Sequence, residues 1–272
     1  MNSVAPQITI LALLASFLLL SIPIFAFARL RLPLIRGTVV AVLRMSGQLL
    51  LVGFFLHYLF DLDHPAITLA WVLLMILFAA GSVVRNCELP LSKFLPPTAF
   101  SMLTVTLFLL WYFLVIVMSR PHMLEIRYAV AIGGMLLGNS LRGNIIGVGG
   151  LRDNLQDNYD LYYYRLALGA SQMEALKPFL QRAVAAAAKP TLAGMTTMGI
   201  VFLPGMMTGQ ILANESPLAA VRYQIAIMLA IYVCTIAGVA LNLLFIVRGN
   251  FDAGGLPDED FLKITPEPTT KS

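Results

Sequence analysis

The sequence predicts an all-α membrane protein with about seven transmembrane helices, and three observations support this fold class. The chain is 59% hydrophobic and only 12% charged, whereas roughly 25% of the residues in an ordinary soluble domain are charged. Its mean hydropathy is +0.83. Seven apolar stretches also approach the length, about 20 residues, that a helix needs to cross a bilayer. We therefore expect a single transmembrane domain over residues 1–248.

The candidate spans follow one another through mostly short loops. They cover residues 8–28, 39–60, 67–84, 99–118, 128–149, 185–213 and 219–247. The first span lacks a basic leading region and is followed at once by the basic stretch RLRLPLIRG, which is the reverse of a secretory signal. We therefore expect a retained helix with its N-terminus outside. An odd number of spans then places the C-terminus inside, and the excess of Lys and Arg in the inside loops favours the same orientation.

Charged residues within the spans narrow the function. None of the 14 acidic residues lies well inside a span, which argues against a proton- or sodium-coupled carrier because such carriers use intramembrane acids. Arg142 is counted with the inside loops, and Arg44 is placed inside the second span. A buried polar contact and an anion site for a substrate are both open for Arg44. The net charge of +4 is attributed to cytoplasmic loops, so no nucleic-acid partner is expected. Membrane lipid is expected to surround the spans.

Two segments lie outside the predicted spans. Residues 249–272 are rich in Gly, Pro and acids, which predicts a mobile cytoplasmic tail without a core of its own. Residues 150–182 contain the run LALGASQMEALKPFLQRA, in which small residues interrupt a helix-forming composition. A short helix docked in a partner's groove would use such a pattern. A helix lying on the membrane surface fits it equally well.

The sixth predicted span is interrupted near its middle by Pro204 and Gly205. Proline cannot donate a backbone hydrogen bond, and glycine is a poor helix former, so a kink or local unwinding is expected. In a bilayer the freed backbone groups need polar partners, which Thr197, Thr208 and Gln210 could provide together with Thr196. Such a break is either a transport site or hinge or a static kink that improves packing.

Glycine pairs and methionines give two further patterns. The pairs at 134 and 138, 143 and 147, and 205 and 209 have GxxxG spacing, which fits either a homodimer or packing within one subunit. Soft sulfur donors gather near the interrupted span, and Met198, Met206 and Met207 are candidate metal ligands there. Packing is the preferred explanation, because methionine side chains fill irregular gaps and no His, Asp or Glu joins this group.

Three stretches carry a resemblance to a known family. GNSLRGNI, ALGASQMEA and GIVFLPGMMTGQILANESPLAAVRYQI closely resemble the bacterial FetB-type iron-export permeases and their plant relatives linked to aluminium tolerance. The resemblance covers about residues 138–224. It implies an ABC-transporter permease subunit of the bacterial inner membrane that forms a homodimer and pairs with two ATPase subunits. ATP and magnesium would be bound by that partner, and iron or another metal would be exported.

The same resemblance assigns roles to residues. Those that would couple the chain to the ATPase are Leu166, Ala167, Leu168, Gly169, Ala170, Ser171, Glu174 and Ala175. Those that would form the translocation pathway or hinge are Thr197, Pro204, Gly205, Met206, Met207, Thr208, Gly209 and Gln210.

Motifs of catalysis are missing from the sequence. It contains no GxxxxGK[ST], HExxH or GxSxG, so the chain is not expected to be an enzyme and ATP hydrolysis would have to be supplied by a partner. An ABC permease for an organic substrate, such as a nucleotide sugar or a lipid, is the main alternative. A stand-alone channel or ion-coupled carrier is the third class, and it would show flux without any ATPase.

Overall fold

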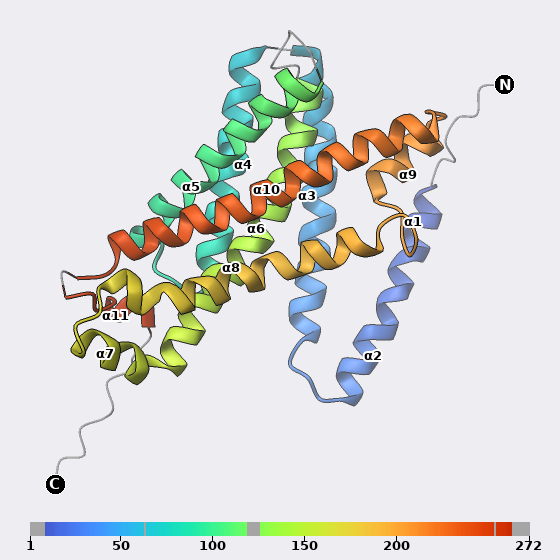
Figure 1. Ribbon diagram of the computed structural model, residues 1–272. Helices are drawn as coiled ribbons and strands as arrows, with labels where there is room; N and C mark the ends of the chain where they lie inside the picture. The colour runs from blue at the N-terminus through green and yellow to red at the C-terminus, as the bar shows by residue number, and fades with distance from the viewer. Residues whose placement is uncertain (1–8, 63, 119–125, 253, 263–272) are drawn as a thin grey trace.

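The structure is a computed structural model, and it describes residues 9–62, 64–118, 126–252 and 254–262. The described residues form helices joined by short turns, without a β-strand, which confirms the predicted all-α class (Figure 1). A 3₁₀ turn, Leu18–Leu20, joins the first two helices, and a π-helical turn, Phe113–Val117, follows α5. The helices are α1 Ile10–Phe17, α2 Ser21–Arg29, α3 Ile35–Leu62, α4 Pro65–Asn86, α5 Leu91–Tyr112, α6 Ile126–Asp157, α7 Tyr159–Ala167, α8 Gln172–Thr197, α9 Gly205–Leu212, α10 Pro217–Gly249 and α11 Glu259–Leu262.

Five helical stretches among the described residues are long and apolar enough to cross a membrane. They are Leu11–Arg29, Ile35–Leu59, Pro65–Asn86, Leu91–Val117 and Pro217–Gly249, and they correspond to the first four predicted spans and the last. The other two predicted spans fall on α6 and on α8 with α9. Both α6 and α8 are long, but polar and charged residues such as Arg142 and Lys189 lower their hydropathy. The seven-span arrangement and its orientation therefore stay predictions.

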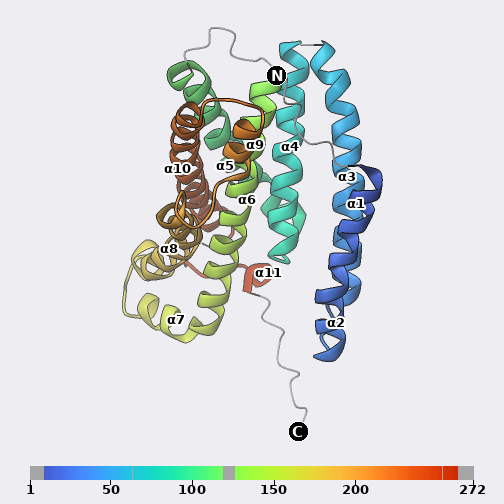
Figure 2. The same cartoon turned by 90° about the vertical axis from the view of Figure 1, so that its right-hand side faces the viewer.

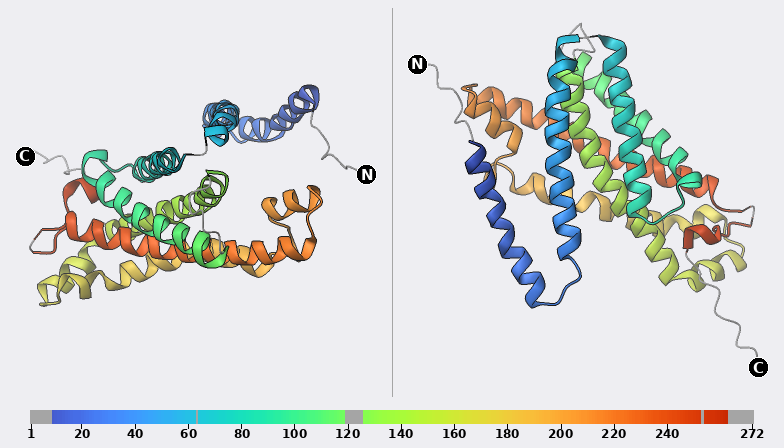
Figure 3. Two further views of the ribbon diagram at one scale, coloured as in Figure 1. Left: turned by 90° about the horizontal axis from the view of Figure 1, so that it is seen from above. Right: turned by 180° about the vertical axis from the view of Figure 1, so that it is seen from behind.

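The N-terminal helices α1 to α3 stand apart from the remaining helices (Figures 2 and 3). The most apolar part of each of the first two spans contains no buried residue. In α10, half of the residues in the corresponding part are buried. A small cluster around Leu59 and Val130 joins α3 to α6. Arg44 on α3 forms no hydrogen bond or ion pair with any described residue. Arg44 therefore does not make, with any described residue, the buried polar contact considered for it above.

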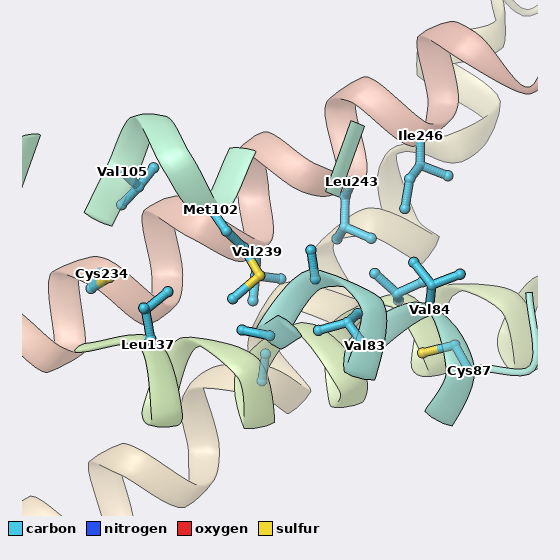
Figure 4. Close-up of a cluster of buried hydrophobic side chains, with 14 of the residues drawn as sticks. Val83, Val84, Cys87, Met102, Val105, Leu137, Cys234, Val239, Leu243 and Ile246 are labelled. Carbon is cyan, nitrogen blue, oxygen red and sulfur yellow. The ribbon is translucent and has the colours of Figure 1, made fainter. Parts of the chain in front are cut away.

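The core is built around α6, which packs on α4, α5, α8 and α10. Val83 of α4, Met102 of α5, Leu137 of α6 and Val239 of α10 point toward one another in this core (Figure 4). At most 3% of each of these side chains is exposed. Because α8 and α10 cross α6 side by side (Figure 1), they enclose the cavity described below.

Small residues bring α6 and α10 into close contact. A Cβ atom placed on Gly147 would lie 2.5 Å from Val239 Cγ1, and one on Gly143 would clash with Thr235. Next to these glycines, Asn242 Nδ2 donates to Asn144 Oδ1 at 2.8 Å. The Gly143 and Gly147 pair therefore packs within one subunit. By contrast, a Cβ on Gly205 or Gly209 would meet no atom within 4 Å.

Gly147→Ala is expected to destabilise the protein. Overpacking a closely fitted contact costs about 1–3 kcal/mol, which exceeds the gain of about 1 kcal/mol in helix propensity when Ala replaces Gly. The midpoint of thermal unfolding in detergent would fall relative to the unmodified chain. Gly138→Ala is the matched control on the same helix, because its Cβ would meet no atom within 4 Å. If both variants raised the midpoint equally, the close contact would be refuted.

Residues 250–252 and 254–262 fold back against the helices. Phe261 is fully buried and stacks on Phe94 of α5, with ring centroids 5.8 Å apart. Tyr162 of α7 donates its hydroxyl to the carbonyl oxygen of Gly255, and burial raises the pKa of Tyr162 to about 12, so the phenol keeps this proton at neutral pH. The segment assigned from sequence to a tail thus adds side chains to the core, and residues 263–272 lie outside the described residues.

Candidate functional site

The turn between α7 and α8 is fixed by its backbone hydrogen bonds. Gly169 has φ +90°, in the left-handed region that glycine adopts without strain. Its N–H donates to Leu166 O at 2.9 Å, and the N–H of Ala170 donates to Arg165 O at 3.1 Å. These two bonds form a Schellman motif, which satisfies carbonyl groups at the end of α7. Gly169 is therefore required by the geometry of the turn itself.

The start of α8 is held by a capping box. Ser171 Oγ accepts from the N–H of Glu174, and Glu174 Oε2 accepts from the N–H of Ser171 at 2.9 Å and from its hydroxyl at 2.7 Å. These hydrogen bonds from Ser171 hold the pKa of Glu174 below its usual value. Two of the predicted coupling residues thus build the turn, as a capping box does at any helix start.

Apolar side chains are exposed at the tip of this turn. Leu168 is 69% exposed, Tyr164 is 60% exposed and Met173 is 47% exposed. Ala175, which was predicted to contact the ATPase, is instead buried in the chain's own core. The exposed surface at the turn therefore excludes Ala175 and includes Tyr164 and Met173, which are not among the predicted coupling residues.

The interrupted helix is broken rather than kinked. The α8 helix ends at Thr197, residues 198–204 are not helical, and α9 begins at Gly205 with Pro204 as its N-cap. Gly199, at φ +84°, donates its N–H to Phe202 O at 2.9 Å and so closes a tight loop. Figure 1 shows α9 turning away from the line of α8. The predicted local unwinding is confirmed and extends over a full loop.

Three of the predicted polar partners bond to carbonyl groups beside the break. Thr196 Oγ1 donates to Ala193 O at 2.8 Å, Thr197 Oγ1 donates to the same oxygen at 3.1 Å, and Thr208 Oγ1 donates to Pro204 O at 3.1 Å. These hydroxyl groups therefore serve the helix ends. They do not line the cavity that the break helps to form.

A cavity of about 540 Å³ lies between α6, α8, α9 and α10. Its polar lining comes from Asn139 and Arg142 on α6, Thr191 on α8 and Gln224 on α10. The remaining lining residues are Met135, Gly143, Ile146, Ala187, Pro190, Gly194, Met198, Phe202, Pro204, Gly205, Met206, Ile227, Met228 and Ile231. The volume lies in the range of about 300–1,000 Å³ typical of small-molecule sites.

The cavity includes only part of the predicted pathway. Pro204, Gly205 and Met206 line it, and Met207 lines an adjoining cavity of about 330 Å³. Gly209 and Gln210 line neither of these two cavities; they border a separate depression next to Met206. The break therefore contributes one wall, and the predicted residues beyond it face elsewhere.

Four methionines line the cavity. Met198 and Met206 are joined there by Met135 of α6 and Met228 of α10, which lie too far away in sequence to be associated with the break. No group of three or more His, Cys, Asp or Glu side chains that could hold a metal ion occurs among the described residues. The cavity therefore offers thioethers without the charged ligands usual in metal sites.

Sequence reasoning missed the polar side of the cavity. Arg142 was counted with an inside loop, but it lies at the middle of α6 and lines the cavity. Asn139 is three residues earlier on the same helix face, and Gln224 reaches the cavity from α10. The signal available was the polar run GNSLRGN inside an otherwise apolar stretch.

Long apolar helices, a broken helix beside a cavity and an exposed turn describe a multi-pass α-helical membrane protein. The chain belongs to the uncharacterised protein family UPF0014, whose family model matches residues 10–251. No solved structure matches the chain significantly.

Relatives of this family come from bacteria and plants. The chain is 32% identical to the UPF0014 membrane protein YjkA of Bacillus subtilis over 76% of its own length and 80% of that protein. It is 31% identical to the protein ALUMINUM SENSITIVE 3 of Arabidopsis thaliana over 69% of its length and 67% of that protein. It is 27% identical to the probable iron export permease protein FetB of Escherichia coli over 81% of its length and 84% of that protein. These relatives confirm the family suggested by the sequence motifs.

Proposed function

We propose that the chain is the membrane-spanning permease subunit of an ABC transporter, which works with a separate ATPase subunit. The observation that carries this proposal is the rigid turn between α7 and α8, whose tip exposes Leu168 and Tyr164. A helix–turn–helix with an exposed apolar tip suits insertion into a partner's groove. The E. coli relative, named as a probable iron export permease, supports the same class of protein.

The proposed assembly contains two copies of the chain and two ATPase subunits, which bind ATP and magnesium. By analogy with the E. coli relative, the cargo is iron or another metal, and the direction is export. An ABC permease for an organic substrate is the second candidate, and it is favoured by the absence of charged metal ligands among the cavity's lining residues.

Reconstitution tests the proposal directly. The chain is co-expressed with its ATPase subunit, the complex is placed in liposomes, and ATP-dependent movement of iron is measured. Omitting ATP, or replacing the Walker lysine of the ATPase, is expected to stop transport. Equal flux through liposomes that contain the chain alone would refute the proposal and would indicate a stand-alone channel or carrier.

The cavity methionines are expected to serve packing. Replacing Met198, Met206 and Met228 together with leucine should leave iron-stimulated ATPase activity within about twofold, because such volume-conserving exchanges disturb packing little. Met102→Leu in the buried core is the matched control. Loss of the metal response in the triple variant alone would show that thioethers bind the cargo.

A further inference from the structure

We propose that the cavity between α6, α8, α9 and α10 binds its cargo through an oxyanion, a carboxylate or a phosphate group. The oxyanion is carried either by a free organic anion or by the metal complex of such an anion, and a bare metal cation is not the species bound. This inference rests on the proposed transport function and specifies the chemistry of the cargo.

Arg142 gives the cavity its charge. It is exposed, lines the cavity, and forms no ion pair with any described residue. None of the lining residues is acidic, and Arg142 is the one charged residue among them, with Thr191 as the polar contribution of α8 and Gln224 as that of α10. Because a guanidinium group stays protonated and presents several N–H donors in one plane, its natural ligand is a carboxylate or phosphate.

Gln224 is the second, independent observation. Only 7% of this residue is exposed, and its side chain makes no hydrogen bond with any residue that the structure describes. Because the amide has no partner among the described residues, its NH₂ group is free to donate to a ligand in the space that Gln224 lines. Gln224 lines both this cavity and the adjoining one, where its NH₂ group can donate to the oxyanion that Arg142 attracts.

The rest of the lining surrounds these polar groups with apolar side chains. Asn139 donates to Met135 O at 2.9 Å, which holds its amide on the same side of α6 as Arg142. Around these groups lie methionines, isoleucines and Phe202, which are apolar. Because Arg142 is itself exposed, solvent still screens part of its attraction for an anion.

The same arrangement disfavours a bare cation. A divalent ion would be repelled by Arg142, and no lining carboxylate offsets this repulsion. The available sulfur donors are neutral thioethers, which prefer softer ions than ferrous iron. A metal that arrives bound to citrate or pyrophosphate instead presents oxyanions to Arg142.

Equilibrium dialysis on the purified chain, with and without its ATPase subunit, tests this inference. The probes are citrate, pyrophosphate, their ferric complexes and ferrous chloride. At least one of the two anions is expected to bind, either free or as its ferric complex, and the stronger form identifies the source. Binding to the chain without ATP-dependent transport would refute the proposed function while leaving the oxyanion site intact.

Arg142→Gln and Gln224→Leu are expected to raise the dissociation constant of the bound anion at least tenfold. Arg142→Lys should restore part of the affinity because it keeps the charge. Arg222→Gln is the matched control, since Arg222 is exposed on α10 and lies outside the cavity lining. Thermal unfolding of each variant shows that it is folded. Binding of ferrous chloride alone, or anion affinity unchanged in both Arg142→Gln and Gln224→Leu, would overturn the inference.

Discussion

Leu168→Arg is expected to abolish co-purification of the chain with the proposed ATPase subunit while the chain still inserts into the membrane. Leu168 is 69% exposed at the tip of the turn, so arginine fits there without disturbing the chain. In an apolar groove of the partner, the new charge would be desolvated without a counter-ion, which typically costs several kcal/mol. Co-purification from detergent extracts, together with ATPase activity, measures the effect.

The choice of Leu168 over Gly169 follows from the backbone. At φ +90° any residue other than glycine is strained at position 169, by about 1–2 kcal/mol, so Gly169→Arg would alter the turn as well as the interface. Gln156→Arg adds the same charge to the exposed face of α6 and is the matched control. If Leu168→Arg left ATPase binding intact and tightened attachment to anionic lipid, α7 and the first turns of α8 would instead lie on the membrane surface.

Rejoining α8 and α9 is expected to lower transport at least tenfold. The double variant Gly199→Ala, Pro204→Ala replaces the residue at φ +84° and the N-cap proline of α9. Alanine stabilises a helix by about 1 kcal/mol relative to glycine and by about 3 kcal/mol relative to proline. The two substitutions therefore remove the residues that disfavour a helix in this loop. A continuous helix would displace the cavity wall that includes Met198 and Pro204. Distances between spin labels at positions 193 and 212 report whether the helices have joined.

Gly209→Ala is the control for this experiment. A Cβ at position 209 meets no atom within 4 Å, and Gly209 lies inside α9 and lines neither of the two cavities, so the substitution leaves the break in place. Its turnover should match that of the unmodified chain. A joined helix with full turnover in the double variant would show that the break is a static feature without a role in transport.

Local sequence chemistry accounts for the parts of the fold that could be predicted. Pro204 and Gly205 indicated a break because helix propensity acts within a few residues. Hydropathy indicated the spans at α4, α5 and α10. It does not indicate whether α6 and α8 cross the membrane, because their charged residues lower the mean hydropathy. The position of a charge on a helix does not tell whether it faces a loop or a cavity, and Arg142 was misplaced for that reason.

The functional surfaces depended on contacts between distant segments. Met135, Arg142 and Gln224 meet in one cavity although some 90 residues separate the first from the last, and no local pattern encodes that meeting. Gly169 and Ser171 have structural roles in the turn that the sequence prediction did not include, and their contact with an ATPase stays a prediction. What the turn exposes became visible only once Tyr162 and Ala175 were seen to be buried.

The folded C-terminal segment has a mechanical consequence. Gly255 is bonded to Tyr162 of α7, while Asp258 and Asp260 bind Lys93 at 3.3 and 2.5 Å near the start of α5. The segment thus connects α7, through the hydrogen bond of Tyr162, with α5, through the ion pairs of Lys93. A displacement of the turn would be transmitted to α8 through the chain and to α5 through this C-terminal segment, so the two helices would move together.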